Sequence, residues 1–315
     1  MEHAPGEFDI IRDYFASAPQ GEGVALGIGD DCALLQVPAQ GQLAASVDTL
    51  VAGRHFPVDA DPAAIAARAL RVNLSDLAAM NARPLWFTLA LTLPHSDADW
   101  LQRFAAGLLN TARLFGISLV GGDTTAGPLS ITIQVLGQTL KPLCRGGARP
   151  GDSVYISGPL GGAAAALPVI LGERPAEGET RRSAERAFYY PEPQFAIAAS
   201  IAGLASSAVD ISDGLLADLA HICTASAVSA DVYLERLAIA PLARALAGKG
   251  ALALAAGGGD DYQLCFTVPQ ARVSALQKLE PEAVAIGTLG SGEAEVRCWQ
   301  NGKRWRVRRT GYRHF

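Results

Sequence analysis

Aspartates that follow glycine or other small residues are the feature of this 315-residue sequence that most suggests chemistry. Most stand where a predicted strand meets a turn, which is where compact α/β proteins place functional groups on a rigid frame. Aspartate and glycine are also ordinary turn formers, so any single occurrence has a purely structural explanation. Their number favours function. The aspartates in this setting are Asp30 in LGIGDDCALL, Asp48 in AASVDT, Asp123 in LVGGDT, Asp210 and Asp213 in VDISDG, and Asp260 in GGGDDY.

The segment LGIGDDCALL (26–35) looks like a glycine-rich loop that offers backbone N–H groups to an anion. However, Asp30 and Asp31 follow Gly29 directly, and two carboxylates repel a phosphate. Either this is a tight turn with solvated acids, or a cation lies between the aspartates and their ligand. Clusters of oxygen donors select hard cations, above all Mg²⁺. We therefore predict that this segment binds magnesium and that magnesium binds phosphate.

Asp76 lies on a helix predicted over 61–80, which begins with the capping pair Asp61-Pro62. Helical spacing places Asp76 on the stripe that should be buried. A buried carboxylate needs a partner, because its desolvation is costly. A hydrogen-bond donor and a metal ion both remain open as that partner. The apolar residues of the stripe are Ile65, Ala69, Val72 and Met80, and the face predicted to be exposed carries Arg68, Arg71 and Ser75.

Composition limits the classes of function. Half of the residues are hydrophobic and 18% are charged, which supports a sizeable folded core. The net charge of −5 and a pI near 5.6 make non-specific nucleic-acid binding a poor expectation. The most basic segment, KRWRVRR (303–309), alternates like an edge strand. The five cysteines stand far apart, so we expect small buried hydrophobes in a reducing compartment.

Neither a leader nor a membrane span is predicted. The segment at 1–15 carries early acids and has no apolar run. An uncharged run at 153–172 is long enough to cross a bilayer, but Gly-Pro and Gly-Gly pairs interrupt it, which favours a strand, a turn and a short helix. We therefore expect a soluble, cytoplasmic protein without a nucleic-acid or membrane partner.

The hydrophobic periodicity predicts an α/β chain in two halves, which meet at the glycine- and proline-rich segment 143–152. We place the domains at 1–148 and 149–315, and we expect 172–183 to be a polar loop. Helices are predicted at 7–18, 61–80, 97–115, 161–171, 193–204, from 214, at 241–248 and at 270–279. Strands are predicted at 42–49, 85–93, 117–123, 130–138, 153–157, 207–211, 230–234 and 262–268, with further strands to the end.

Seven short motifs occur together and in order, and together they resemble the thiamine-monophosphate kinase family of bacterial thiamine metabolism over about residues 5–315. They are LGIGDDCALL, SVDTLVAGRHF, VNLSDLAAM, LVGGDTTAGPLSITI, RGGARPGD, VDISDGLLADL and the closing GYRHF. No lysine stands in a G-x-x-x-x-G-K-[ST] loop, so metals, glycine backbone and arginine would have to carry the phosphate chemistry.

The resemblance implies direct in-line transfer of the γ-phosphoryl group of ATP to thiamine monophosphate, assisted by several Mg²⁺ ions and without an acid/base residue. It also implies the two-domain fold of aminoimidazole ribonucleotide synthetase. In that fold, 1–148 would bind ATP and magnesium and pair through its sheet in a homodimer, and 149–315 would be a C-terminal α/β domain. The family pattern places magnesium ligands at Asp30, Ser46, Val47, Asp48, Asp76, Asp123, Asp210 and Asp213, ATP contacts at Gly122, Asp123, Arg145 and Ser212, and thiamine-phosphate contacts at His55, Asp260 and Tyr312.

One motif departs from the family pattern. GGEDYEL is replaced by GGDDYQL, so Asp260 is one methylene shorter than the usual glutamate, and Gln263 is neutral. From the residues alone, His55 also reads as a solvated loop histidine and Tyr312 as a core aromatic. The rival functions are an ATP-using enzyme of the same fold with another acceptor, an Mg²⁺-dependent phosphatase and a non-enzymatic nucleotide-binding module.

Overall fold

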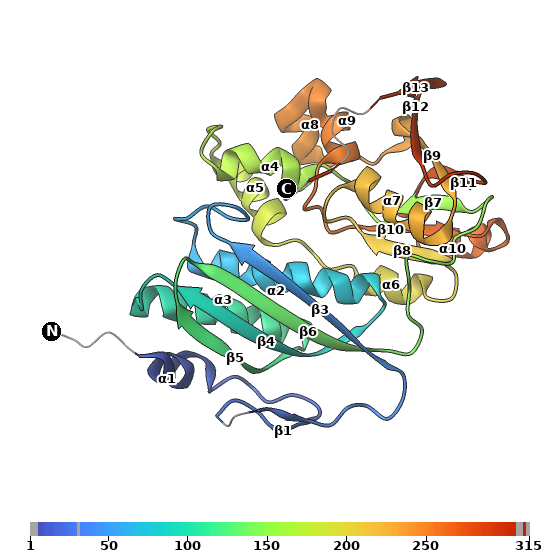
Figure 1. Cartoon of the computed structure of the whole chain (residues 1–315). Helices are drawn as coiled ribbons and strands as arrows, with labels where there is room; N and C mark the ends of the chain where they lie inside the picture. Colours follow the sequence, from blue (N-terminus) through green and yellow to red (C-terminus); the bar gives the residue numbers. More distant parts are fainter. Residues whose placement is uncertain (1–5, 30–31, 307–310, 313–315) are drawn as a thin grey trace. The chain divides into compact units, whose positions relative to one another are not determined.

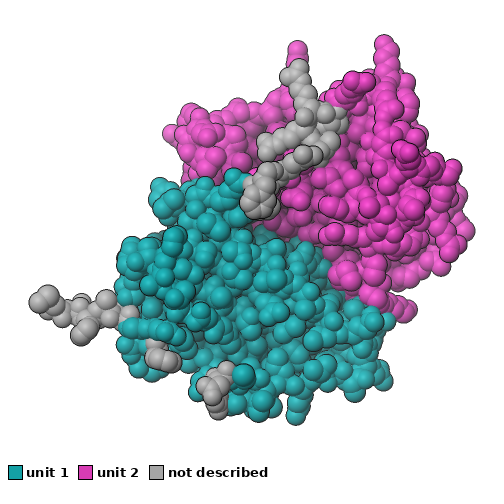
Figure 2. All heavy atoms as spheres, in the orientation of Figure 1, with its two compact units in different colours: residues 1–77, 82–140 teal, residues 78–81, 141–315 magenta. Residues whose placement is uncertain are grey.

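The computed structural model describes residues 6–29, 32–306 and 311–312. The chain divides into two compact units (Figure 2), one of residues 1–77 and 82–140, the other of residues 78–81 and 141–315. Each unit combines helices with a sheet, which agrees with the predicted fold class. The assignment of nucleotide binding and dimerisation to 1–148 stays a prediction.

The sheet of the first unit has the strand order β3-β6-β4-β5. β3 and β4 both pair with β6 in antiparallel fashion, and β5 pairs with β4 in parallel. β3 and β5 are therefore the edges of this sheet. The strands are β3 (Gln42–Val51), β4 (Arg83–Leu93), β5 (Ser118–Ala126) and β6 (Ser130–Thr139).

Helices α2 (Pro62–Ala79) and α3 (Ala98–Phe115) lie along one face of this sheet (Figure 1). Local signals set the ends of α3, because the side chain of Asp97 accepts the N–H of Trp100 and Gly116 has a φ of 63°. The remaining elements of the unit are α1 (Glu7–Ile10), a π-helical turn (Ile11–Phe15), β1 (Val24–Leu26) and β2 (Leu34–Leu35).

The prediction of an exposed face on α2 is wrong. Arg68, Arg71 and Ser75 are all buried, and the guanidinium of Arg71 lies over the ring of Phe115. Asp76, predicted to be buried, is more accessible than its neighbours on the helix. Alanine, leucine and valine occur on every side of α2, and this composition is typical of a helix that is buried all round.

The sheet of the second unit has the order β13-β12-β9-β11-β7-β10-β8, with antiparallel pairs except between β12 and β9. Its central strands are buried on both faces: Val154 and Ile156 pack on one side and Tyr155 on the other. The strands are β7 (Ser153–Ile156), β8 (Ser207–Asp210), β9 (Ser229–Tyr233), β10 (Leu264–Val268), β11 (Val284–Gly290), β12 (Val296–Gln300) and β13 (Lys303–Trp305).

Helices cover both faces of this second sheet. Side chains of α7 and α9 belong to the core cluster on one face, and side chains of α6 and α10 belong to the cluster on the other. The helices are α4 (Gly162–Ile170), α5 (Gly178–Tyr189), α6 (Phe195–Ile201), α7 (Leu215–Ser226), α8 (Pro241–Ala247), α9 (Ala251–Gly257) and α10 (Val273–Leu279), with short 3₁₀ turns at Leu234–Arg236, Gly248–Gly250 and Gln270–Arg272.

Several local predictions are corrected. The polar segment 172–183 is not a loop throughout, because α5 begins at Gly178, and α9 was not predicted. Cys32 and Cys144 are exposed, whereas the other three cysteines are buried as expected.

The run at 153–172 forms β7 and α4, and among the described residues no helix combines the length and apolar character that crossing a membrane requires. The edge-strand prediction holds for 303–305, while 307–309 lies outside the described residues.

Gly107 of α3 allows the close approach of α2. A Cβ atom there would lie 2.4 Å from the carbonyl oxygen and 2.6 Å from the Cα of Ala63. We expect Gly107→Ala to lower the free energy of unfolding by about 1–3 kcal/mol, because overpacking outweighs the gain in helix propensity. Urea denaturation would measure this. Gly250→Ala is the control, since the nearest atom to its Cβ would be 3.8 Å away. Equal effects of both changes would contradict the packing argument.

Candidate active site

In the first unit, α2 holds β3 through two side chains of its own. The hydroxyl of Ser46 donates to Oδ2 of Asp76 at 2.5 Å. The N–H of Asp48 donates to Oδ1 of Asn73 at 3.0 Å, and the amide of Asn73 donates to the carbonyl of Ala69. Asn73 and Asp76, three residues apart on the helix, thus contact Asp48 and Ser46, two residues apart on the strand. Because alternate residues of a strand share a face, Ser46 and Asp48 both face α2, so the structure brings Ser46, Asp48 and Asp76 together.

Val47 lies on the opposite face of β3, with 57% of its side chain exposed. Its side chain therefore points away from Asp76, and it could contribute only a backbone oxygen to a metal site near that carboxylate.

His55 lies in the tight turn that follows β3. The N–H of Val51 donates to its Nδ1 at 2.9 Å, and Gly53, with a φ of 75°, donates its N–H to the carbonyl of Phe56. With Nδ1 acting as the acceptor, the proton of the neutral imidazole is on Nε2. The imidazole is partly accessible and is oriented by the backbone, which favours a binding role over that of a freely solvated loop residue.

Gly122 and Asp123 lie on β5, at the other edge of the same sheet. The register aligns Asp48 with Ile133, Ile133 with Leu89, and Leu89 with Gly122. Three strand spacings separate the two edges, which corresponds to about 14 Å. Asp123 is the next residue along β5, so its side chain points to the face opposite that of Asp48. Within one chain, Asp48 and Asp123 are therefore too far apart to bind the same ion.

In the second unit, three predicted segments converge. The N–H of Asp260 donates to the carbonyl of Ser212 at 2.8 Å, and the N–H of Tyr262 donates to the carbonyl of Ile211 at 2.9 Å. The N–H of Tyr312 donates to the carbonyl of Asp213 at 3.0 Å. The turn 210–214 thus accepts hydrogen bonds from the loop 257–262 and from the segment 311–312.

The loop 257–262 contains an unusual backbone conformation. Asp260 has a φ of 68° and Tyr262 a φ of 48°, and the hydroxyl of Tyr262 donates to Oδ1 of Asp260 at 3.1 Å. Left-handed conformations of residues other than glycine are uncommon and concentrate at functional sites. The prediction that Asp260 contacts a ligand stays a prediction, and this local conformation supports it.

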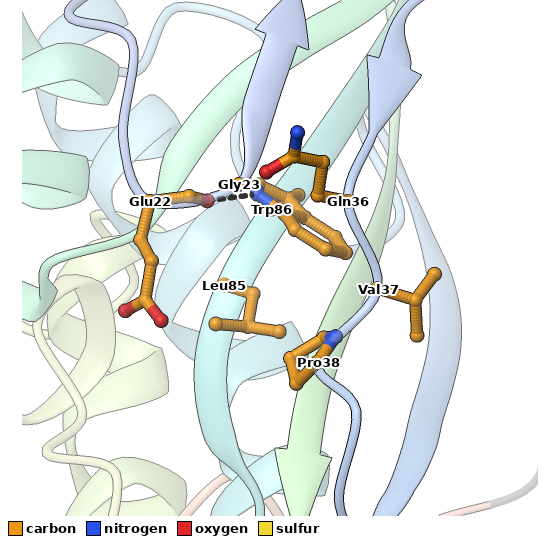
Figure 3. A pocket seen from close by; sticks show the side chains of 7 residues that line it. All are labelled: Glu22, Gly23, Gln36, Val37, Pro38, Leu85 and Trp86. Atoms are coloured by element: carbon orange, nitrogen blue, oxygen red, sulfur yellow. Dashed lines mark hydrogen bonds between the residues drawn. The ribbon is translucent and has the colours of Figure 1, made fainter.

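A hollow in the first unit lies elsewhere. Its lining includes Trp86, Leu85, Val37 and Pro38, and the indole N–H of Trp86 donates to the carbonyl of Glu22 at 2.8 Å (Figure 3). Among the described residues, none of the predicted site residues lines this hollow. We therefore assign it no role in the chemistry.

The arrangement of acids can be compared with the magnesium prediction. Asp30 lies outside the described residues. Within the described ranges, no three His, Cys, Asp or Glu side chains approach closely enough to hold a metal ion. The hydroxyl of Ser46 and the carboxylate of Asp76 do come together, and the backbone of Asp48 is held to the same helix. Hydroxyl and carboxylate oxygens are donors of the type that Mg²⁺ prefers.

Comparison with known proteins identifies the family. Models of AIR synthase related proteins match residues 29–139 with the N-terminal domain and residues 149–298 with the C-terminal domain. The sequence is 42% identical to thiamine-monophosphate kinase of Escherichia coli strain K12, and the match covers 99% of each chain. This chain belongs to the thiamine-monophosphate kinase family. The family predicted from the motifs is thereby confirmed.

Solved structures of the thiamine-monophosphate kinase family share the fold. The enzyme from Stenotrophomonas maltophilia K279a superposes with a TM-score of 0.82 at 40% identity, covering 90% of this chain and 93% of that chain. AaThiL complexed with AMPPCP and TMP gives a TM-score of 0.80 at 30% identity, covering 91% and 92%. The hydrogenase maturation protein HypE of E. coli is 19% identical with a TM-score of 0.74, which shows the likeness of fold alone.

Sequence reasoning missed Asp218, which lies in the first turn of α7. Its Oδ2 accepts the N–H of Asp213 at 3.1 Å and that of Gly214 at 3.0 Å. Burial raises the pKa of Asp218 to about 7; nearby Asp213 also raises it, whereas nearby Arg145 lowers it. The carbonyl of Arg145, a predicted ATP contact, accepts the hydroxyl of Ser226 at the C-terminal end of α7. The signal for Asp218 was an acid in the first helical turn of DISDGLLADL.

Asp261 was noted only as the neighbour of Asp260, but it forms the N-terminal cap of α4. Oδ2 accepts the N–H of Gly161 at 2.5 Å, and Oδ1 accepts the N–H of Ala163 at 3.3 Å. Gly161 precedes the helix and has no side chain with which to cap it. Loss of solvent around the carboxyl raises the pKa of Asp261 to about 7, although these N–H donors lower it. No local sequence signal reveals a cap that comes from so far along the chain.

The raised pKa of Asp261 predicts a pH dependence of stability. The unfolded chain ionises this carboxyl near 3.8, whereas the folded chain retains the proton to about 7. The contribution of this group to stability is therefore complete below 3.8 and is lost as the pH rises towards 7, by at most about 1.4 kcal/mol per pH unit. We expect Asp261→Asn to flatten the decrease of Tm between pH 5 and pH 7.

Thermal unfolding across that pH range would test this expectation. Asp97→Asn, which changes the exposed cap of α3, should keep the wild-type slope. The comparison concerns slopes, because the asparagine also loses one of two acceptors and lowers Tm at every pH. An Asp261→Asn slope equal to that of the wild type would contradict the assignment.

The attachment of β3 to α2 gives a second prediction. Asn73→Ala leaves the N–H of Asp48 without its amide acceptor, so we expect the free energy of unfolding to fall by about 1–3 kcal/mol. Asn110→Ala, at an exposed site of α3, should change it by less than about 0.5 kcal/mol. Urea denaturation of both variants would measure the difference, and an Asn73→Ala variant as stable as Asn110→Ala would refute the attachment.

Proposed function

We propose that this chain transfers the γ-phosphoryl group of ATP to thiamine monophosphate and forms thiamine diphosphate. The similarity to AaThiL complexed with AMPPCP and TMP carries the proposal, because it extends over 91% of this chain with a TM-score of 0.80. AMPPCP is a non-hydrolysable analogue of ATP. Its presence beside TMP in a relative of this chain supports both substrates.

The chemistry of the acceptor agrees with the residues present. A phosphate monoester has a second pKa of about 6, so the attacking oxygen is already ionised at neutral pH and a strong general base is not needed. The main difficulty is to bring two polyanions together in line. Carboxylates on rigid elements suit this task if cations lie between them and the phosphates.

We further propose that magnesium ions are bound by the acids of both units. Ser46, Asp48 and Asp76 would serve on the first unit, and Mg²⁺ bound there would neutralise phosphate charge and align the transferred group. The oxygen-only donor set supports the choice of metal. Further donors in this proposal are Asp30, Asp123, Asp210, Asp213 and the backbone of Val47.

In this proposal, further contacts bind the two substrates. Gly122, Asp123, Arg145 and Ser212 would contact ATP, and His55, Asp260 and Tyr312 would contact thiamine phosphate. His55 supports this role through its oriented Nε2–H, and Asp260 through its left-handed backbone. The hydrogen bond of Tyr312 to the turn 210–214 places that residue beside Asp213.

We also propose that the protein is a cytoplasmic homodimer that pairs through the first sheet. The face of β3 away from α2 exposes hydrophobic side chains: Leu43, Val47 and Val51 are 45%, 57% and 37% exposed. Apolar residues gathered on one sheet face favour a partner surface. Asp123 lies on the same face, so pairing would bring it towards the second copy.

A product assay tests the function. Purified protein, ATP, Mg²⁺ and thiamine monophosphate should yield thiamine diphosphate, with EDTA and free thiamine giving none. Release of phosphate without an acceptor would indicate a phosphatase instead. ADP formation without thiamine diphosphate would indicate a different acceptor.

Substitution of the predicted metal ligands gives the matching prediction. Asp48→Asn and Asp76→Asn should each lower kcat by roughly 100-fold or more, because loss of one ligand charge removes several kcal/mol of transition-state stabilisation. The fold should persist, since the asparagine at 76 can still accept from Ser46 and the backbone of residue 48 still bonds Asn73. Glu22→Gln removes an equal charge from an exposed site and should leave kcat unchanged. Near wild-type kcat at saturating Mg²⁺ would exclude the altered residue as a ligand.

A further inference from the structure

Asp218 is a buried acid inside α7 that accepts hydrogen bonds from the backbone before the helix. α7 begins after Gly214, which has a φ of 127° and no side chain to act as a cap. Asp218 reaches back from inside the helix, so that a single oxygen, Oδ2, accepts the N–H groups of Asp213 and Gly214. The N–H of Asp218 in turn donates to the carbonyl of Gly214. The residue is only 3% exposed, so water does not compete for these bonds.

These bonds fix the backbone of Asp213 on both sides. Its N–H is held by Asp218, and its carbonyl accepts the N–H of Tyr312. Space around the turn is also filled: a Cβ on Gly214 would lie 3.0 Å from the carbonyl of Gly257, and one on Gly311 would lie 2.6 Å from Cβ of Ala217. The position of the Asp213 carboxylate therefore depends on how far the Asp218 oxygen reaches.

The same turn supports the neighbouring candidate residues. The carbonyl of Ser212 accepts the N–H of Asp260, and the carbonyl of Ile211 accepts that of Tyr262. A displacement of the turn at Asp213 would therefore pass to the loop 257–262 through peptide groups rather than through flexible side chains. A shift of about 1 Å at a site of this kind is enough to cost activity.

We propose that Asp218 is a positioning residue, which holds the turn 210–214 so that Asp213 and Ser212 engage magnesium-bound ATP. The inference rests on the proposed function for the identity of the nucleotide and for the roles of Asp213 and Ser212. Position of the acceptor oxygen, rather than charge, performs this role. Asparagine at 218 can still accept both N–H groups, whereas glutamate keeps the charge but places its oxygens one methylene farther out.

The test compares Asp218→Asn with Asp218→Glu in the full chain. Calorimetry would measure the Kd of AMPPCP in the presence of Mg²⁺, and steady-state kinetics would separate the KM for ATP from kcat. We expect Asp218→Asn to stay within about 3-fold of wild type in Kd and KM. We expect Asp218→Glu to raise both by about 10-fold or more.

Asp152 supplies the matched control. It is 5% exposed, and its Oδ2 accepts the N–H of Arg149 and the hydroxyl of Ser206 in the same unit, away from the turn 210–214. Asp152→Glu should lower Tm by an amount similar to Asp218→Glu without changing the Kd of AMPPCP. A purely structural role for Asp218 would instead give both glutamate variants the same Kd.

Two outcomes overturn the proposal: Asp218→Glu binds AMPPCP as the wild type does, or Asp218→Asn binds as weakly as Asp218→Glu. Each is distinct from failure of the proposed function. If the wild type binds AMPPCP but does not phosphorylate thiamine monophosphate, the acceptor is wrong and the positioning role still stands on the binding data. If the wild type binds no AMPPCP with Mg²⁺, both are wrong.

Discussion

The candidate site depends on one constraint: a peptide N–H that water cannot reach must find an acceptor within the protein. Side chains provide several of these acceptors. Asn73 accepts from Asp48, Asp218 from Asp213, and Asp261 from Gly161. In the first and third pairs, the acceptor lies far from the donor in the sequence. Asp218 lies only five residues after its donor, Asp213. The segments that carry candidate residues are thus held in place by hydrogen bonds to their backbone.

The two units solve this problem differently. In the first, a helix and an edge strand carry the acids, and the match between α2 and β3 aligns Ser46 and Asp48 with Asp76. In the second, three loops meet, and backbone hydrogen bonds to the turn 210–214 hold them together.

The departure from the family motif has a structural counterpart. Oε1 of Gln263 accepts the hydroxyl of Ser157 at 2.7 Å, and that hydroxyl oxygen accepts the N–H of Leu264. A Cβ on Gly158 would lie 2.5 Å from the same Oε1. The neutral side chain therefore holds the end of β7 to the start of β10. The shorter acid at 260 keeps a contact of its own, with the hydroxyl of Tyr262.

The positions of several elements and the family of this protein could be predicted from the sequence alone. Strand alternation located β4 and β6, periodicity placed α3 close to the predicted 97–115, and the ordered motifs identified the family that the comparisons confirm. Periodicity is a local property, so a single sequence reveals it. Tertiary structure alone decided the rest. Burial of Arg68 and Arg71, the capping of α4 by Asp261, and the opposite faces of Asp48 and Asp123 each depend on residues far apart in the chain. No local pattern encodes such pairings, because they exist only once the sheet and its covering helices have packed.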